Sequence, residues 1–187
     1  MEETGASDLE AFALCAPPLR LSHSTMPVWF QRHVSPAILR GYRPADRSML
    51  FYMVSLAWIQ NETINVWTHL AGALTFAIQL CGAAHAVDDP YIVTYRLAAC
   101  ICFAISAGFH LLMPLSERAY VRLQRCDFAA IFVLIGGTAI PFYSIEYDCR
   151  RDLLAAALCC TAVLTVLLAG LVGHGSHSAV LSTEVRR

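Results

Sequence analysis

Four long apolar runs, separated by short polar segments, fill most of the chain after its first third. They cover residues 64–84, 91–113, 128–145 and 153–172. A helix that crosses the hydrocarbon core of a bilayer needs about 20 mostly apolar residues, a length that the third run nearly reaches and the others do reach. The pattern predicts four transmembrane helices, and the short links between them favour antiparallel neighbours in a bundle.

The segments outside these runs are shorter or more polar. Residues 48–60 are apolar but too few to span a bilayer, so they predict a helix lying at the interface. Residues 1–47 contain five prolines among polar residues, which is typical of a largely disordered tail. With a polar tail over 174–187, the predicted membrane domain covers residues 48–173.

Composition supports a membrane protein. The chain is 57% hydrophobic and 14% charged, whereas soluble domains carry about 25% charged residues. The net charge of −1 argues against a nucleic-acid partner. None of the eight cysteines forms a CxxC pair, and most lie in apolar runs, where cysteine behaves as a small hydrophobic residue. The predicted fold class is an all-α integral membrane protein.

The arginines predict the orientation of the helices. They precede the first run and occupy the link between the second and third runs, whereas the link between the first and second runs has none: Arg40, Arg43, Arg47, Arg118, Arg122 and Arg125. Because arginine is enriched in cytoplasmic segments, we expect a cytoplasmic amino terminus. Arg150 and Arg151, in the third link, argue weakly against this orientation. The glycosylation sequon at Asn61 would then lie on the cytoplasmic side, where glycans are not added.

Polar residues gather where the second run ends and the third begins. Ser106 and His110 are four residues apart and share one helix face, and the chain doubles back to bring Asp127 to the same depth. Ionisable residues at membrane depth often mark function, and an imidazole beside a carboxylate can hold a metal. The alternative is a simple hydrogen-bonded pair, because a zinc site needs three or four ligands and these residues supply two at most.

A second polar cluster opens the first run. Asn61, Asn65 and His69 recur every four residues and line one helix face, with Glu62 beside them. Such side chains either tie the helix to its neighbours by hydrogen bonds or line a ligand pocket. His174 and His177 lie in the predicted carboxyl-terminal tail, where a histidine pair is usually a surface feature.

The motifs "GYRP", "NETINVWTHL", "SAGFH" and "CDFAAIFVLIGGTAIPFYS" occur in this order between residues 39 and 144. They resemble the progestin and adipoQ receptor family. The resemblance implies a seven-helix membrane fold and a zinc ion held by His110 together with two histidines of a later HxxxH motif. It also implies that Asp127 contacts the metal-bound water and that Ser106 belongs to the same motif.

The chain departs from this family pattern after residue 172, where no further apolar run and no HxxxH motif follow. We therefore expect a shortened form, a partial seven-helix bundle of about four helices, in which zinc binds weakly or not at all. The main functional hypothesis is a membrane signalling receptor. The alternatives are a zinc-dependent lipid amide (ceramide) hydrolase with an incomplete metal site, with Asp127 and Ser106 as catalytic candidates, and a non-catalytic partner of full-length receptors.

The same resemblance suggests the partners and the compartment. We expect contact with membrane lipids, a steroid, adipokine or ceramide-like ligand, and homo- or hetero-oligomers with longer family members. The expected location is the plasma membrane, with the Golgi or endoplasmic reticulum as alternatives.

Overall fold

Four long helices dominate the computed structural model, which describes residues 21–83, 89–147 and 150–184, the last segment by its backbone alone from 172 onward. The helices are α4 (Thr63–Ala83), α5 (Pro90–Leu112), α6 (Glu117–Glu146) and α7 (Arg151–Glu184). In the described residues, these four are long and apolar enough to cross a membrane. The prediction of an all-α membrane protein with four spans is confirmed.

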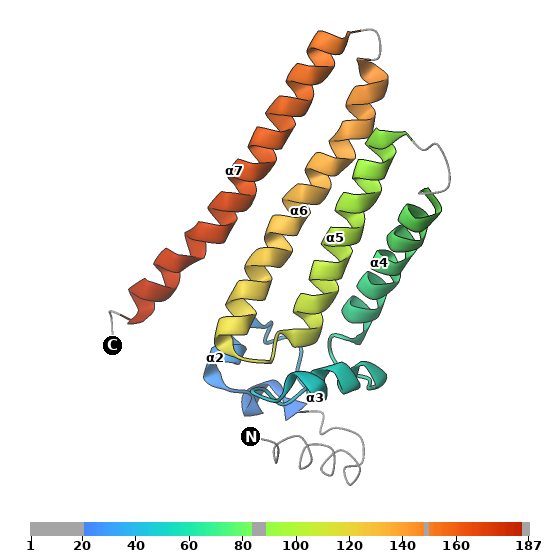
Figure 1. Cartoon of the computed structure of the whole chain (residues 1–187). Helices are drawn as coiled ribbons and strands as arrows, with labels where there is room; N and C mark the ends of the chain where they lie inside the picture. Colours follow the sequence, from blue (N-terminus) through green and yellow to red (C-terminus); the bar gives the residue numbers. More distant parts are fainter. Residues whose placement is uncertain (1–20, 84–88, 148–149, 185–187) are drawn as a thin grey trace, which may run out of the picture.

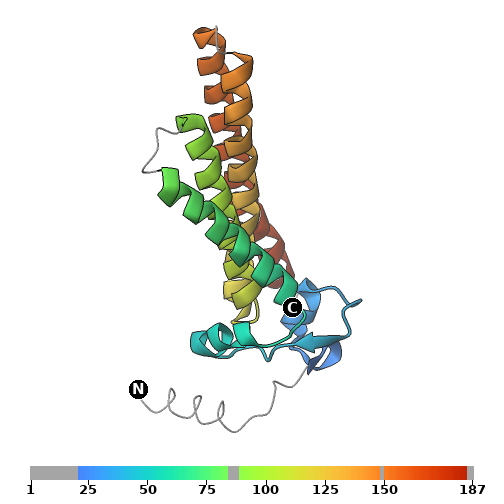
Figure 2. The same ribbon diagram turned by 90° about the vertical axis from the view of Figure 1, so that its right-hand side faces the viewer.

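The four helices stand side by side in a single row (Figure 1). Helix α5 packs between α4 and α6, and α7 packs against α6. Figure 2 shows the row nearly edge-on, with α4 inclined to the other three helices. Because the row is one helix thick, apolar side chains such as Leu97 on α5 and Val163 on α7 remain exposed.

Glycines allow the helices of this row to approach closely. A Cβ atom added to Gly137 would lie 2.4 Å from Ala98 Cβ on α5, and one added to Gly72 would lie 2.9 Å from the Phe103 ring. Gly136 meets α7 in the same way, since its Cβ would lie 2.5 Å from Thr165 Oγ1. Small residues at such crossings are the usual means by which membrane helices gain packing contacts.

Polar caps set the beginnings of two helices. The Asp89 carboxylate accepts a hydrogen bond from the Tyr91 backbone N–H at the start of α5, and the Ser116 hydroxyl accepts one from Ala119 at the start of α6. Helix α6 therefore begins at Glu117, eleven residues before the run predicted to start at 128. Most of the second link is thus helical, because a serine cap starts a helix without needing an apolar run.

Residues 21–62 cover the end of the row where α4 begins, α5 ends and α6 begins; we call this segment the cap and this end the base. The cap contains β1 (Leu21–Ser22), η1 (His23–Thr25), α2 (Val28–His33), β2 (Arg40–Tyr42), α3 (Met49–Val54) and η2 (Ser55–Ala57). Strands β1 and β2 pair antiparallel. Helix α3 lies across the base within the stretch predicted as an interfacial helix (Figure 1).

The expectation of a largely disordered tail over residues 1–47 is wrong for residues 21–47; residues 1–20 lie outside the described part of the chain. Met26, Phe30 and Tyr42 of the cap form one buried cluster with Phe109 and Tyr120 near the base. The apolar residues are spaced irregularly, so they carry no helical period in the sequence. They are ordered because the ends of α5 and α6 offer them an apolar surface.

Gly41 is the middle residue of β2, where the pairing with β1 shifts its register. Its φ of 101° is in the left-handed region that favours glycine, and a Cβ there would lie 3.3 Å from the Asn61 backbone nitrogen. The Gly41 carbonyl accepts a hydrogen bond from that nitrogen at 3.0 Å. Gly41 thereby brings β2 next to the start of α4.

The final helix is longer than the sequence predicts. Helix α7 continues to Glu184, although the fourth apolar run ends at residue 172 and a polar tail was expected from 174. No proline interrupts residues 173–184, so the segment keeps its capacity for backbone hydrogen bonds. The side chains of His174 and His177 lie outside the described residues.

Candidate functional site

Glu62 is the centre of the polar cluster at the base. Its side chain is buried and accepts three hydrogen bonds: Asn61 Nδ2 donates to Oε1 at 2.6 Å, Asn65 Nδ2 donates to Oε2 at 2.8 Å, and His110 Nδ1 lies 2.9 Å from Oε2. A buried carboxylate is costly unless it is paired in this way. The cluster therefore joins the beginning of α4 to the end of α5.

These contacts also control the protonation of Glu62. Burial acts to raise the pKa of its carboxyl group, but the hydrogen bonds from His110 and Asn65, with the nearby charges of His110 and Arg43, hold that pKa below its usual value. The carboxylate is therefore the expected form. Because a carboxylate can only accept, His110 Nδ1 is the donor in its hydrogen bond with Glu62.

Arg43 fixes the backbone of the same histidine. The residue is only 2% exposed; its NH2 group donates to the His110 carbonyl at 2.9 Å and its NH1 group donates to the Leu111 carbonyl at 2.7 Å. NH1 also donates to Ser55 Oγ at 2.9 Å, and the guanidinium carbon lies 5.4 Å from the centre of the Tyr52 ring. Burial lowers the pKa of Arg43 to about 10, so it stays charged at neutral pH.

Arg43 satisfies two of the carbonyl groups that a helix leaves without partners at its carboxyl end. Its positive charge also complements the negative end of the α5 dipole. The side chain of Arg43 therefore points into the protein and not toward solvent or lipid headgroups. One sequence gives no sign of which arginine is buried, since Arg40, three residues earlier, is exposed.

The other predicted site residues lie around this pair. His69 on α4 contacts His110 edge to face with 5.6 Å between ring centres, and its Nδ1 is buried without a hydrogen-bond partner. Ser106 on α5 and Asp127 on α6 are both buried. In the described part of the chain, neither forms a hydrogen bond or ion pair with His110, which pairs with Glu62 instead.

The metal centre implied by the family resemblance needs more ligands than these residues provide. Among the described residues, no group of three or more His, Cys, Asp or Glu side chains is arranged to hold a metal ion. The described residues therefore do not fit a complete zinc site.

The sequence singled out the polar residues of α4 but not their arrangement. It aligned Asn61, Asn65 and His69 on one face, whereas the structure places Glu62 between the two amides as their common acceptor. The sequence did contain a signal for this arrangement: Glu62 lies between Asn61 and Asn65 at the start of an apolar run. Its partner His110 lies 48 positions away, and only the packing of α4 against α5 brings them together.

Comparisons with known proteins identify the family of this chain. The haemolysin-III related family matches residues 57–180. The chain is 34% identical over 140 residues to membrane progestin receptor alpha of Cynoscion nebulosus, a match covering 70% of this chain and 39% of the relative. It is 35% identical over 119 residues to the mouse (Mus musculus) receptor of that name, covering 59% of this chain and 34% of the relative.

A more distant relative has the same family name that the motifs suggested. Progestin and adipoQ receptor-like protein 1 of Caenorhabditis elegans is 27% identical over 139 residues, which cover 71% of this chain and 32% of that protein. The match thus spans 32–39% of the length of these relatives. With the match over residues 57–180, the chain belongs to the haemolysin-III related family, which includes the progestin and adipoQ receptors.

Proposed function

We propose that this chain is a membrane receptor protein that binds a lipid-soluble ligand among its helices. Ligand binding would then change the conformation of the cap. Family membership and the receptor names of its relatives support the receptor role. The observation that carries the proposal is the double attachment of His110. Its side chain pairs with Glu62 and its backbone carbonyl accepts from Arg43, so the end of α5 and the cap cannot move independently.

This linkage provides a route from the membrane to the cap surface. A ligand that shifts α5 relative to α4 would change the Glu62–His110 distance and the Arg43 contacts together. Both contacts are part-buried and charge-assisted, so their loss is costly and favours two discrete arrangements over gradual deformation. A ligand can drive such a change only by binding one arrangement more tightly than the other.

The test is ligand binding by the full chain in lipid nanodiscs. Because several relatives are named as progestin receptors, tritiated progesterone is the first probe. We expect saturable binding, and we expect the ligand to change hydrogen–deuterium exchange in residues 39–62. Absence of saturable binding, or binding with unchanged exchange in the cap, would contradict the proposal.

A zinc-dependent lipid amide hydrolase is a second candidate, favoured by one observation. A carboxylate that holds one imidazole nitrogen, as Glu62 holds His110 Nδ1, is the usual support of a metal-ligating histidine. In this candidate His110 would be a ligand, with Ser106 and Asp127 near the metal, and the remaining ligands would come from outside the described residues. Metal analysis of the purified chain tests it: stoichiometric zinc that is lost in His110→Ala would favour the hydrolase, and its absence would count against it.

The orientation is part of the proposal. Arginine placement supports a cytoplasmic base, and the Asn61 amide that a glycan would use donates instead to Glu62. We propose the plasma membrane as the compartment and association with longer family members as a further role. A glycan found on Asn61 would contradict the orientation, and crosslinking to a longer relative in intact membranes would test the association.

A further inference from the structure

A groove lies in the cap, where β2 runs beside the segment that leads into α4; we call it the cap groove. It has a volume of about 230 Å³ and is lined by Arg40, Gly41, Ile59, Gln60 and Asn61. The Asn61 backbone N–H donates to the Gly41 carbonyl at 3.0 Å, so the two sides of the groove are joined. Neither Glu62 nor His110 lines it, so it is distinct from the polar cluster at the base.

The cap groove lies at the level of the lipid headgroups. Helix α4 begins two residues after Asn61, and its 21 residues extend about 32 Å at 1.5 Å per residue. This length matches a hydrocarbon core of about 30 Å. The residues just before α4 therefore lie in the layer of phosphate and glycerol groups outside that core. Trp67, near the start of α4, is exposed, as expected for a tryptophan at the interface.

Arg40 gives the cap groove a positive charge. Its side chain is exposed, and its guanidinium forms no ion pair or hydrogen bond with the other described residues. The described lining includes no acid, and the neighbouring Glu62 is buried with its oxygens engaged by two asparagines and His110. The guanidinium is therefore available to bind a phosphate group through two parallel hydrogen bonds.

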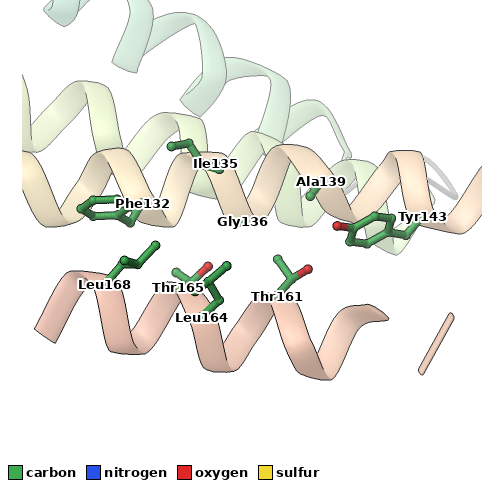
Figure 3. A pocket seen from close by; sticks show the side chains of 9 residues that line it. All are labelled: Phe132, Ile135, Gly136, Ala139, Tyr143, Thr161, Leu164, Thr165 and Leu168. Atoms are coloured by element: carbon green, nitrogen blue, oxygen red, sulfur yellow. The ribbon is translucent and has the colours of Figure 1, made fainter. Parts of the chain in front are cut away.

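The groove between α6 and α7 lacks such a charge. Figure 3 shows its lining, which includes apolar and hydroxyl-bearing side chains: Phe132, Leu164, Leu168, Tyr143, Thr161 and Thr165. Its volume is about 140 Å³, and its lining residues belong to the membrane-spanning parts of the two helices. Of these two grooves, only the cap groove combines a cation with the depth of the headgroups.

Two further residues limit the molecule that fits the cap groove. The Gln60 side chain lines it, and Gln60 Oε1 has no hydrogen-bond partner among the described residues. Ile59 is 73% exposed beside it. A headgroup with hydroxyl donors, followed by acyl chains, suits both residues, because hydroxyls bond an amide and acyl chains cover an isoleucine. A choline headgroup suits them less well, since its quaternary ammonium has no N–H donor and its positive charge opposes Arg40.

We propose that the cap groove binds an anionic phospholipid of the leaflet next to the base, with Arg40 holding its phosphate and Gln60 its polar headgroup. The acyl chains pass Ile59 and the exposed Ile64 and enter the hydrocarbon core beside α4. This inference goes beyond the proposed receptor function and does not depend on it.

The experiment is native mass spectrometry of the full chain in mild detergent, titrated with phosphatidylglycerol or with phosphatidylcholine. Phosphatidylglycerol has the phosphate charge, two hydroxyls and no cationic group, so we expect its first bound molecule to have a Kd about fivefold lower than that of phosphatidylcholine. In Arg40→Gln, loss of the charged hydrogen bonds should raise the phosphatidylglycerol Kd about tenfold. The matched control is Arg47→Gln, an exposed arginine of the cap that does not line the groove, and it should leave the Kd unchanged.

Two further measurements test the headgroup and the acyl chains. Gln60→Met keeps the length of the side chain and removes the amide, so it should raise the phosphatidylglycerol Kd about threefold and leave the phosphatidylcholine Kd unchanged. Inorganic phosphate at the concentration of the lipid should not displace it, because phosphate lacks the chains that contact Ile59. Thermal unfolding of each variant verifies that it remains folded.

Several results would overturn this site. Equal affinities for the two lipids, or equal losses of affinity in Arg40→Gln and Arg47→Gln, would mean that binding reflects the general charge of the surface. Displacement of the lipid by an equal concentration of inorganic phosphate would mean that the groove holds a free anion. Each of these results leaves the receptor function standing, because that function is tested separately by progesterone binding.

Discussion

At the scale of single residues, the structure depends on a few buried charges that satisfy one another. Glu62 receives donors from α4 and α5, and Arg43 donates to carbonyls at the end of α5 and to a serine of the cap. Each group would be costly if its partners were removed, because buried polar atoms without hydrogen bonds lose their water and gain nothing. Substitutions of these buried groups should therefore lower the free energy of unfolding more than substitutions of exposed charged residues.

Glu62→Gln tests the acceptor at the centre of the cluster. Glutamine has one oxygen in place of two, so one of the three donors loses its acceptor, and we expect a loss of about 1–3 kcal/mol in the free energy of unfolding. Denaturant unfolding in mild detergent measures it. Glu146→Gln, at an exposed site on α6, is the control and should change stability little. Equal stability of the two variants would show that the cluster is not stabilising.

Arg43→Lys tests the attachment of the cap. Lysine keeps the charge but lacks the fork of donors that reaches His110, Leu111 and Ser55. We expect faster hydrogen–deuterium exchange across residues 39–62 and a loss of about 2–3 kcal/mol in stability. The exposed Arg40, changed to lysine, serves as the control. Unchanged exchange in the Arg43 variant would indicate that the cap is held by its apolar cluster alone.

We expect His33 to make the cap sensitive to acid. Its ring stacks on Tyr120, with 4.5 Å between the ring centres; burial lowers the pKa of His33, Glu117 partly offsets this and Arg32 adds to it. A histidine whose folded pKa is below its unfolded value stabilises the neutral form, so its contribution is present above about pH 6.5 and falls as the pH drops below that value.

We therefore expect exchange in residues 28–34 to increase between pH 7.5 and pH 5, after correction for the intrinsic pH dependence of exchange. His33→Phe should reduce this increase, because phenylalanine keeps the stacking and cannot be protonated. An identical pH response in both proteins would exclude His33 as its source. Since the side chain is partly exposed, the effect should be modest.

At the scale of helices, contact between neighbours depends on glycines. Gly137→Ala would place a methyl group 2.4 Å from Ala98 Cβ and force α5 and α6 apart. We expect a loss of about 1–3 kcal/mol in stability, as for other overpacked interiors. Gly108→Ala is the matched control, because nothing lies within 4 Å of its added Cβ and alanine favours helix. Thermal unfolding that ranks Gly108→Ala as the more damaging change would contradict this packing.

At the scale of the whole molecule, the single row leaves lipid access to both faces. Spin labels at Leu97 on α5 and at Val163 on α7 should therefore collide with dissolved oxygen in nanodiscs, whereas a label at the buried Ala99 should not. Power-saturation electron paramagnetic resonance measures these collisions. Shielding of Leu97 at higher protein concentration would show that another copy covers this face.

The sequence could predict much of this architecture. The length of the apolar runs marked all four spans, because the bilayer imposes one length requirement on every helix. The motifs carried the family assignment, which the comparisons confirm. The sequence could not predict that residues 21–47 are folded. Their apolar residues become buried only against helices that come later in the chain.

The sequence by itself determined that this chain enters a membrane as four helices, because hydrophobic length is a local property. The tertiary structure alone decided that Glu62 meets His110, that Arg43 turns inward to hold α5, and that the hydroxyls of α6 and α7 share one groove. Each of these pairs joins residues from different elements. Their meeting depends on how the helices cross, and the crossings are set by small residues whose effect is visible only when the neighbouring helix is in place.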